Sequence, residues 1–310
     1  MRRPGSLDIA LLFLLAFIWG SSFTLIKVVV PHLPPLSLTL WRVALAAVAL
    51  LLAAWWRRES VRFSPRGWLW IVLAGLTGNA LPFTLISWGE ERIDSGLAAI
   101  LISITPLMVL GLAHFFTRDE RLTPPRVAGM ALGLAGVVAL IGPRSLLHLG
   151  EETLRQLAVA AAAFSYAVNT LIIRHLQLVH MNDERTGPVA LAAVIMATSA
   201  LTLAPLALWH DGLVLPRASA TALAAMLGVV HTALATLIMF AIIARAGATF
   251  FATINFLIPI FGYLLGVFTL GEAFSWRAVL ALALVLAGIW LNARASRSRS
   301  RAARAAAHRG

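Results

Sequence analysis

The chain has no cysteine and very little charge. With no cysteine among its 310 residues, disulfide bonds and thiolate metal sites are excluded. Charged residues make up 12% of the sequence, whereas hydrophobic residues make up 60%. A soluble protein of this length would carry far more charge. The shortage of charge therefore indicates a membrane protein.

The sequence also lacks the clusters of reactive side chains that an enzyme needs. It contains no convergent nucleophile–base set and no pair of histidines one turn apart on a predicted helix. We therefore expect no enzyme activity, no cofactor and no metal. The net charge of +12 is compatible with nucleic-acid binding, but many of the arginines lie in the last residues of the chain. We expect residues 294–310 to form a disordered basic tail near anionic lipid headgroups, and no nucleic-acid partner.

Long apolar runs separated by charged or proline-containing segments fill the rest of the chain. Runs of roughly 20 residues are typical of helices that cross a hydrocarbon core, and the period-two alternation of a barrel is absent. The first run is too long for a signal peptide and is interpreted as a helix. The predicted helices span residues 7–29, 36–56, 68–88, 95–116, 126–141, 153–173, 188–209, 219–243, 248–270 and 276–292.

The second half of the sequence repeats the first. Arg92 and Arg245 lie 153 residues apart, as do Pro106 and Pro259, and a glycine and glutamate pattern follows each proline. The repeats cover residues 7–142 and 151–293. Because each repeat holds five predicted helices, the two must enter the membrane in opposite directions. This inverted repeat is the architecture of secondary transporters, which bind substrate between the halves near the midplane of the bilayer.

Arginine and lysine predict the orientation of the helices. Cytoplasmic loops carry an excess of these residues. With both termini in the cytoplasm, the cytoplasmic loops hold most of the arginines. The outer loops then hold only Arg92, Arg144, Arg155, Arg217 and Arg277. The sequence therefore predicts cytoplasmic termini, in a protein of the bacterial inner membrane.

Several short motifs occur in the same order in a known family. They are Trp19–Phe23, Trp41–Arg42, Pro106, Glu120–Leu122, Gly129, Gly133 and Gly136, followed by Tyr166–Arg174, Pro259, Gly271–Glu272 and Gly288. On these motifs the chain resembles the EamA-type branch of the drug/metabolite transporter superfamily, and within it the YddG-like amino acid exporters. The resemblance implies that helices 1, 3, 4, 6, 8 and 9 surround a central cavity and that helices 5 and 10 lie at the periphery.

Polar residues within the spans are the candidate substrate contacts, since each needs a partner or a cavity in the membrane. The repeat pairs Trp19 with Tyr166, which suggests two aromatic walls. Arg42 can hold a carboxylate, although we expect a helix-end carbonyl or an outer carboxylate as its partner. Lys27 is expected to extend toward the membrane surface. The substrate contacts predicted are Trp19, Ser22, Asn79, Tyr166, Asn169, His231 and Asn255, and the predicted hinges are Pro106 and Pro259.

No acidic residue falls in the middle of a predicted helix, and Glu90, Glu91 and Glu272 are assigned to outer loops. Coupled carriers commonly keep a carboxylate within the membrane for the coupling ion. We therefore predict gradient-driven export or exchange of small neutral or zwitterionic metabolites, amino acids such as threonine, methionine and aromatic ones foremost. Two alternatives are a proton-coupled drug or metabolite exporter that uses His231, and a membrane scaffold without transport.

Overall fold

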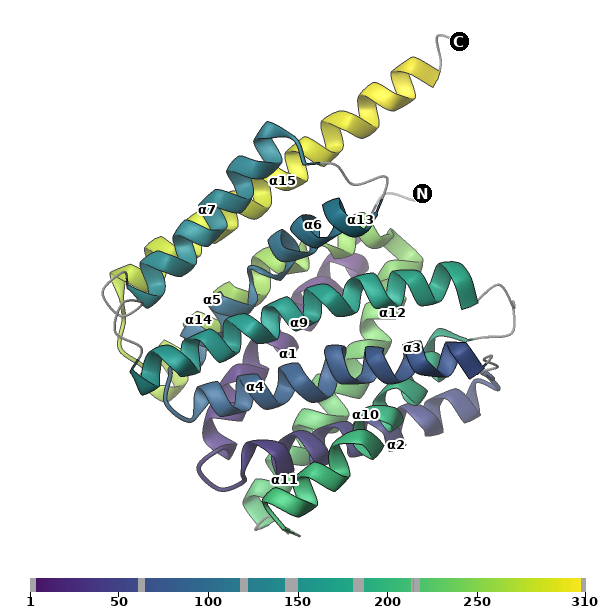
Figure 1. Ribbon diagram of the computed structural model, residues 1–310, viewed down its shortest axis with the longest axis vertical. Helices are drawn as coiled ribbons and strands as arrows, with labels where there is room; N and C mark the ends of the chain where they lie inside the picture. Colours follow the sequence, from purple (N-terminus) through teal and green to yellow (C-terminus); the bar gives the residue numbers. More distant parts are fainter. Residues whose placement is uncertain are drawn as a thin grey trace.

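The computed structural model folds the chain into helices that are joined by short connections (Figure 1). It describes residues 4–60, 65–117, 122–142, 150–180, 187–212, 214 and 218–307. Within these residues, 10 helical stretches are long and apolar enough to cross a membrane. They lie where the sequence predicts them, to within a few residues at each end. The predicted all-helical membrane fold is therefore confirmed.

Each half of the chain contains one stretch with a π-helical turn and one that is broken in two. The first half contains α1 (Ser6–Val29), α2 (Pro35–Trp56), α3 (Pro65–Gly75), η1 (Leu76–Ala80), α4 (Leu81–Glu90), α5 (Ser95–Ile102), α6 (Thr105–Phe116) and α7 (Pro124–Ile141). The second half contains α9 (Glu151–His180), α10 (Pro188–His210), α11 (Ala218–Gly228), η2 (Val229–Leu234), α12 (Ala235–Ala246), α13 (Ala248–Phe251), α14 (Ile254–Leu270) and α15 (Trp276–Ala307).

Proline and glycine mark several helix ends. Pro35 and Pro188 stand in the first turns of α2 and α10, where a backbone N–H has no partner within the helix. Gly271 ends α14 with a φ of 68°, a left-handed conformation that glycine adopts without strain. Gly247 separates α12 from α13 with a φ of 86°. These residues divide a largely apolar sequence into separate helices.

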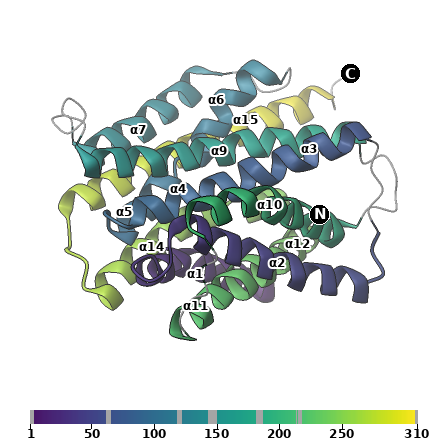
Figure 2. The ribbon, with the colours of Figure 1, turned by 60° about the horizontal axis from the view of Figure 1, so that its bottom comes forward.

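Glycines also allow the helices to approach one another closely. α1 packs along α14, and a Cβ atom added to Gly20 would lie 2.6 Å from the Cβ atom of Phe261. α7 packs along α15, where a Cβ atom on Gly288 would clash with the carbonyl oxygen of Gly129. Figures 1 and 2 show α7 and α15 side by side at one edge of the bundle. This is the peripheral position that the resemblance implies for helices 5 and 10.

The last helix extends further than the sequence predicts. α15 continues to Ala307, through most of the segment that we expected to be disordered. Alanine and arginine both favour helix, which accounts for the continuation. The start of α1 and the end of α15 lie toward the same side of the molecule in Figure 1. Glu120 and Arg121, which belong to one of the family motifs, lie outside the described residues.

Candidate functional site

The two π-helical turns stand at equivalent positions of the two repeats. η1 lies between α3 and α4, and η2 lies 153 residues later between α11 and α12. A π-helical turn contains an extra residue, and such turns are frequent at functional sites. η1 carries Gly78 and Asn79, and η2 carries their repeat mates His231 and Thr232. The irregular turns therefore present the polar residues of both halves.

A central cavity of about 320 Å³ lies between the two halves of the chain. Its walls combine aromatic rings with a small number of polar groups, and a volume of this size is at the lower end for small-molecule sites. The residues that line it come from α1, α2, η1, α4, α5, α6, α9, α10, η2, α12 and α14. Eight of the predicted residues are among them: Trp19, Ser22, Arg42, Asn79, Tyr166, His231, Asn255 and Pro259.

Arg42 is a buried cation in the cavity wall, with 6% of its surface exposed. Its Nε atom donates to the hydroxyl of Thr232 at 2.9 Å, and its guanidinium lies 3.8 Å from the centre of the Phe83 ring. The direct contacts of Arg42 are therefore an uncharged hydroxyl and an aromatic ring, and not the expected carbonyl or carboxylate. Both contacts orient the guanidinium without neutralising it, and a planar fork of donors suits a carboxylate.

His231 is held by two hydrogen bonds and is 2% exposed. Its Nδ1 atom lies 3.1 Å from the carbonyl oxygen of Met226, and its Nε2 atom lies 3.1 Å from the Oγ atom of Ser21. A carbonyl only accepts, so Nδ1 carries a hydrogen. Nε2 can then accept from the Ser21 hydroxyl, or donate to it while Ser21 donates to the carbonyl of Ile18 at 3.1 Å. The network satisfies both the neutral and the protonated ring.

The two halves contribute one aromatic wall each. Trp19 on α1 and its repeat mate Tyr166 on α9 both line the cavity. Trp19 packs edge-on against Phe251, with the ring centroids 6.1 Å apart. Ser22 follows Trp19 by one turn and donates to its carbonyl at 2.7 Å. Trp19 and Tyr166 therefore border the same space, and their role in binding a substrate stays a prediction.

Asn79 and Asn169, two of the three predicted asparagines, lie in different places. Asn79 lines the cavity and donates to the Oγ atom of Ser199 at 3.3 Å. Asn169 does not belong to the lining described for this cavity. It packs directly on η1, since a Cβ atom on Gly78 would lie 2.5 Å from its Nδ2 atom, and Thr77 donates to its Oδ1 atom at 3.4 Å. Asn169 therefore packs against the π-helical turn η1 and does not line the cavity.

The two predicted hinges occupy different positions relative to the helix breaks. Pro106 follows the break between α5 and α6 and lines a second cavity of about 550 Å³. Pro259 lies inside α14, five residues after the first residue of that helix, Ile254, and it lines the central cavity. Asn255 lines both cavities, so the two spaces adjoin. Because Pro259 has no N–H, the carbonyl of Asn255 has lost its usual helical donor.

The structure adds cavity residues that the prediction did not include, and most are repeat mates. Thr232 lies 153 residues after Asn79, and Gly78 lies 153 residues before His231. The predicted aromatic pair, Trp19 and Tyr166, is related by an offset of 147 residues in the same way. The offset was visible in the sequence and could have identified these residues. Further pairs with both members in the lining are Phe83 with Thr236, Ile102 with Asn255, and Thr105 with Ile258.

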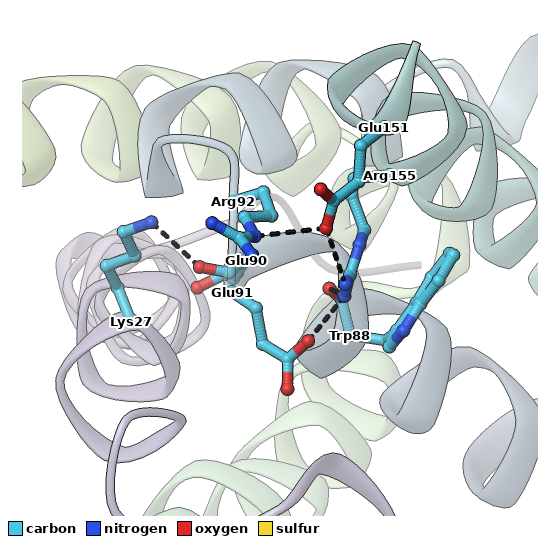
Figure 3. Close-up of polar contacts among 7 residues, drawn as sticks. All are labelled: Lys27, Trp88, Glu90, Glu91, Arg92, Glu151 and Arg155. Atoms are coloured by element: carbon cyan, nitrogen blue, oxygen red, sulfur yellow. Dashed lines mark hydrogen bonds and ion pairs between the residues drawn. The ribbon is translucent and has the colours of Figure 1, made fainter. Parts of the chain in front are cut away.

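Ion pairs join the two repeats at both ends of the bundle. Asp8, at the start of α1, is fully buried and pairs with Arg245 at the end of α12, with Oδ1 and Nε 2.7 Å apart. At the opposite end, Arg155 near the start of α9 pairs with Glu91, which follows α4 (Figure 3). Asp8 and Arg155 are repeat mates at a separation of 147 residues. The other two members are not repeat mates, because the repeat mate of Arg245 is Arg92 and not Glu91.

Glu90 and Lys27 differ from the prediction. Glu90, assigned to an outer loop, is the last residue of α4 and is fully buried. Lys27, expected to extend toward the membrane surface, instead donates to the carbonyls of Glu90 and Ile93, both at 2.8 Å. The ends of α1 and α4 pack together, and this packing buries Glu90 completely and Lys27 in part.

The profile of the EamA-like transporter family matches residues 7–142 and, a second time, residues 154–294. The chain belongs to the EamA-like transporter family. It is accordingly a membrane transporter and not an enzyme. With its ten apolar helices, it is a multi-pass integral protein of the kind found in the bacterial inner membrane.

Curated relatives cover nearly the whole chain. A protein of Streptantibioticus cattleyicolor named "Probable terminal-alkyne amino-acid exporter" is 29% identical over 92% of this chain and 93% of its own length. The S-adenosylmethionine/S-adenosylhomocysteine transporter of Chlamydia trachomatis is 28% identical over 90% of this chain and 87% of its own length. An uncharacterized transporter of Archaeoglobus fulgidus is 25% identical over 91% of this chain and 95% of its own length.

A solved crystal structure has the same fold. It superimposes with a TM-score of 0.64 at 22% sequence identity, covering 92% of this chain and 96% of the other. At this identity the likeness concerns the fold alone.

Proposed function

We propose that the protein transports small zwitterionic or neutral metabolites, amino acids foremost, through the central cavity. One observation carries the proposal: the cavity combines a buried, un-neutralised Arg42 with aromatic walls, and no carboxylate lines it among the described residues. A cationic substrate would lack a counter-charge in such a site, whereas a carboxylate would find one. Threonine, methionine and aromatic amino acids are small enough for the space.

The geometry suggests how an amino acid would bind. Its carboxylate would accept hydrogen bonds from the Arg42 guanidinium. Its ammonium group would donate to the Asn255 carbonyl, which Pro259 leaves without a helical donor. Its side chain would lie between Trp19 and Tyr166, where burial of apolar surface favours larger side chains. The unlike chemistry of the repeat mates makes the cavity asymmetric, as recognition of three different groups requires.

The relatives support export as the direction of transport, since one of them is named an amino-acid exporter. We propose alternating access, in which inverted repeats at residues 7–142 and 151–293 move against each other around the cavity. The ion pairs Asp8–Arg245 and Arg155–Glu91 would close the two ends in turn. Both termini would be cytoplasmic, with the arginines of residues 294–310 near anionic lipid headgroups.

Proton-coupled export through His231 is a second candidate. It is favoured by the hydrogen bonds of His231, which satisfy the ring in both protonation states. In that case an imposed pH gradient would drive uptake, and replacement of His231 by glutamine would abolish the response.

Counterflow in proteoliposomes tests the proposal. Vesicles that contain the wild-type protein and are loaded with unlabelled threonine, methionine or phenylalanine should accumulate the labelled amino acid. Vesicles without the protein should not. His231→Ala and Asn79→Ala should each lower the initial rate by tenfold or more at normal expression. Absence of counterflow for all three amino acids would reject the amino-acid assignment, and unchanged rates in both variants would reject the cavity as the site.

A further inference from the structure

The carboxyl group of Glu90 is buried without a hydrogen-bond partner. No part of the residue is exposed, and neither carboxyl oxygen meets a donor among the described residues. Lys27 is close, but its ammonium group donates to the backbone carbonyl of Glu90 (Figure 3). It also donates to the backbone carbonyl of Ile93. An ionised carboxylate in such surroundings is strongly destabilised, because nothing replaces the water that it loses.

The charged groups around Glu90 come from several elements. Glu272, in the segment after α14, repels the ionised form of Glu90. Lys27 on α1 and Arg42 on α2 attract it. Glu272 itself accepts the backbone N–H groups of Ser95 and Gly96 at 2.6 and 3.0 Å, at the start of α5 where a negative charge is favoured. Arg155 on α9 is directed toward Glu91 and Trp88. Of the two interacting carboxyl groups, Glu90 is thus the one without donors.

Glu90 lies directly beyond the wall of the central cavity. Ile86 on α4 and Phe23 on α1 line that cavity, and Glu90 and Lys27 follow them by one helical turn on the same faces. The ends of α1 and α4 therefore close the cavity on this side. Any movement that opens this end must bring water to the Glu90 carboxyl group.

We propose that Glu90 is a proton-binding site, and that this end of the cavity closes only when its carboxyl group is neutral. This inference rests on the proposed transport function. On opening, water reaches the carboxyl group, its O–H bond breaks, and the proton passes to water. The resulting carboxylate is then hydrated and lies near the Lys27 ammonium group. Closing requires the reverse step, with one proton taken up from the solution on that side.

The pH dependence of exchange provides the first test. Because closing consumes one proton, counterflow by the wild-type protein should fall as the pH rises, by up to about tenfold per pH unit. Glu90→Gln keeps a neutral side chain of the same size, so it should retain counterflow and lose the pH dependence. The matched control is Glu152→Gln, an exposed carboxylate at the same end, which should keep the wild-type profile. A wild-type profile in Glu90→Gln would overturn the proposal.

Infrared difference spectroscopy provides a test that needs no substrate. The spectrum of the wild-type protein minus that of Glu90→Gln at neutral pH should contain the carbonyl stretch of a protonated carboxylic acid. Absence of that band would overturn the proposal even if transport is normal. Presence of the band together with a failure of all three amino acids to exchange would contradict the proposed substrate and leave the proton site standing.

Discussion

At the scale of single residues, Arg42 is a positive charge in the cavity wall that a hydroxyl and an aromatic ring orient. If it binds the substrate carboxylate, Arg42→Gln removes a charge-assisted hydrogen bond of about 1.5–3 kcal/mol. The half-saturating concentration for amino acids should rise roughly 10- to 100-fold. Arg42→Lys should give an intermediate value, because it keeps the charge but loses the planar fork. Kinetics of uptake by reconstituted protein measure this.

The matched control for Arg42 is Arg58→Gln, since Arg58 is exposed after α2. It should leave the half-saturating concentration unchanged. Equal effects of the two replacements would contradict a substrate-binding role for Arg42.

Asp211 lies just outside the membrane-spanning segments and links the end of α10 to the start of α2. It accepts from the backbone N–H of Ser37 at 3.0 Å, from its hydroxyl at 2.7 Å, and from His210 at 2.7 Å. Burial alone would raise its pKa, but the hydrogen bonds from His210 and Ser37 outweigh that effect and hold the pKa of Asp211 below its usual value. The carboxylate also lies at the amino end of α2, where a negative charge is stabilising.

A lowered pKa means that the ionised form of Asp211 contributes stability at neutral pH, and that this contribution disappears as the pH falls through the lowered pKa. Asp211→Asn should therefore lower the melting temperature at pH 7, by an amount typical of a helix-capping contact of ~1 kcal/mol. The wild type and the variant should converge in acid. Thermal unfolding in detergent across a pH series checks this, and a constant difference at all pH values would contradict it.

At the scale of helices, the crossing of α1 and α14 depends on Gly20. A Cβ atom there would also lie 3.1 Å from the backbone of Ile258 and Gly262, so the helices would have to separate. Overpacking of this kind costs about 1–3 kcal/mol. Gly20→Ala should lower the melting temperature by several degrees, whereas Gly150→Ala, with nothing within 4 Å, should have little effect. A tolerated Gly20→Ala would show that this contact is looser than the structure indicates.

The elements differ in how well the sequence predicts them. Apolar length and punctuation by proline and glycine are enough to locate the ten spans, because each must cross the same thickness of lipid. The π-helical turns were not predicted, since one extra residue in a helix leaves the apolar composition unchanged. The packing of Asn169 against Gly78 could not be predicted either, because it depends on which face of α9 meets η1. Glu90 was misassigned because its burial depends on the packing of α1 against α4.

At the scale of the whole molecule, the two ion pairs between repeats should act on opposite ends. Asp8→Asn removes the partner of Arg245, and Glu91→Gln removes a partner of Arg155. If each pair helps to close its own end, the two replacements should shift the population of open states in opposite directions. Proteolysis or labelling from each side of oriented vesicles measures the shift. A shift in the same direction for both would contradict the assignment of the pairs to separate gates.

The central claim is that one cavity between the repeats binds an amino acid and opens to each side of the membrane in turn. The chain contains no cysteine, so Ser22→Cys would place a single thiol in the cavity lining. The decisive measurement is the rate at which a membrane-impermeant maleimide labels this thiol in right-side-out and in inside-out vesicles, with and without excess methionine. We predict labelling from both sides, and slower labelling from both when methionine is present. Labelling from one side only, or rates that methionine and phenylalanine leave unchanged, would contradict the account.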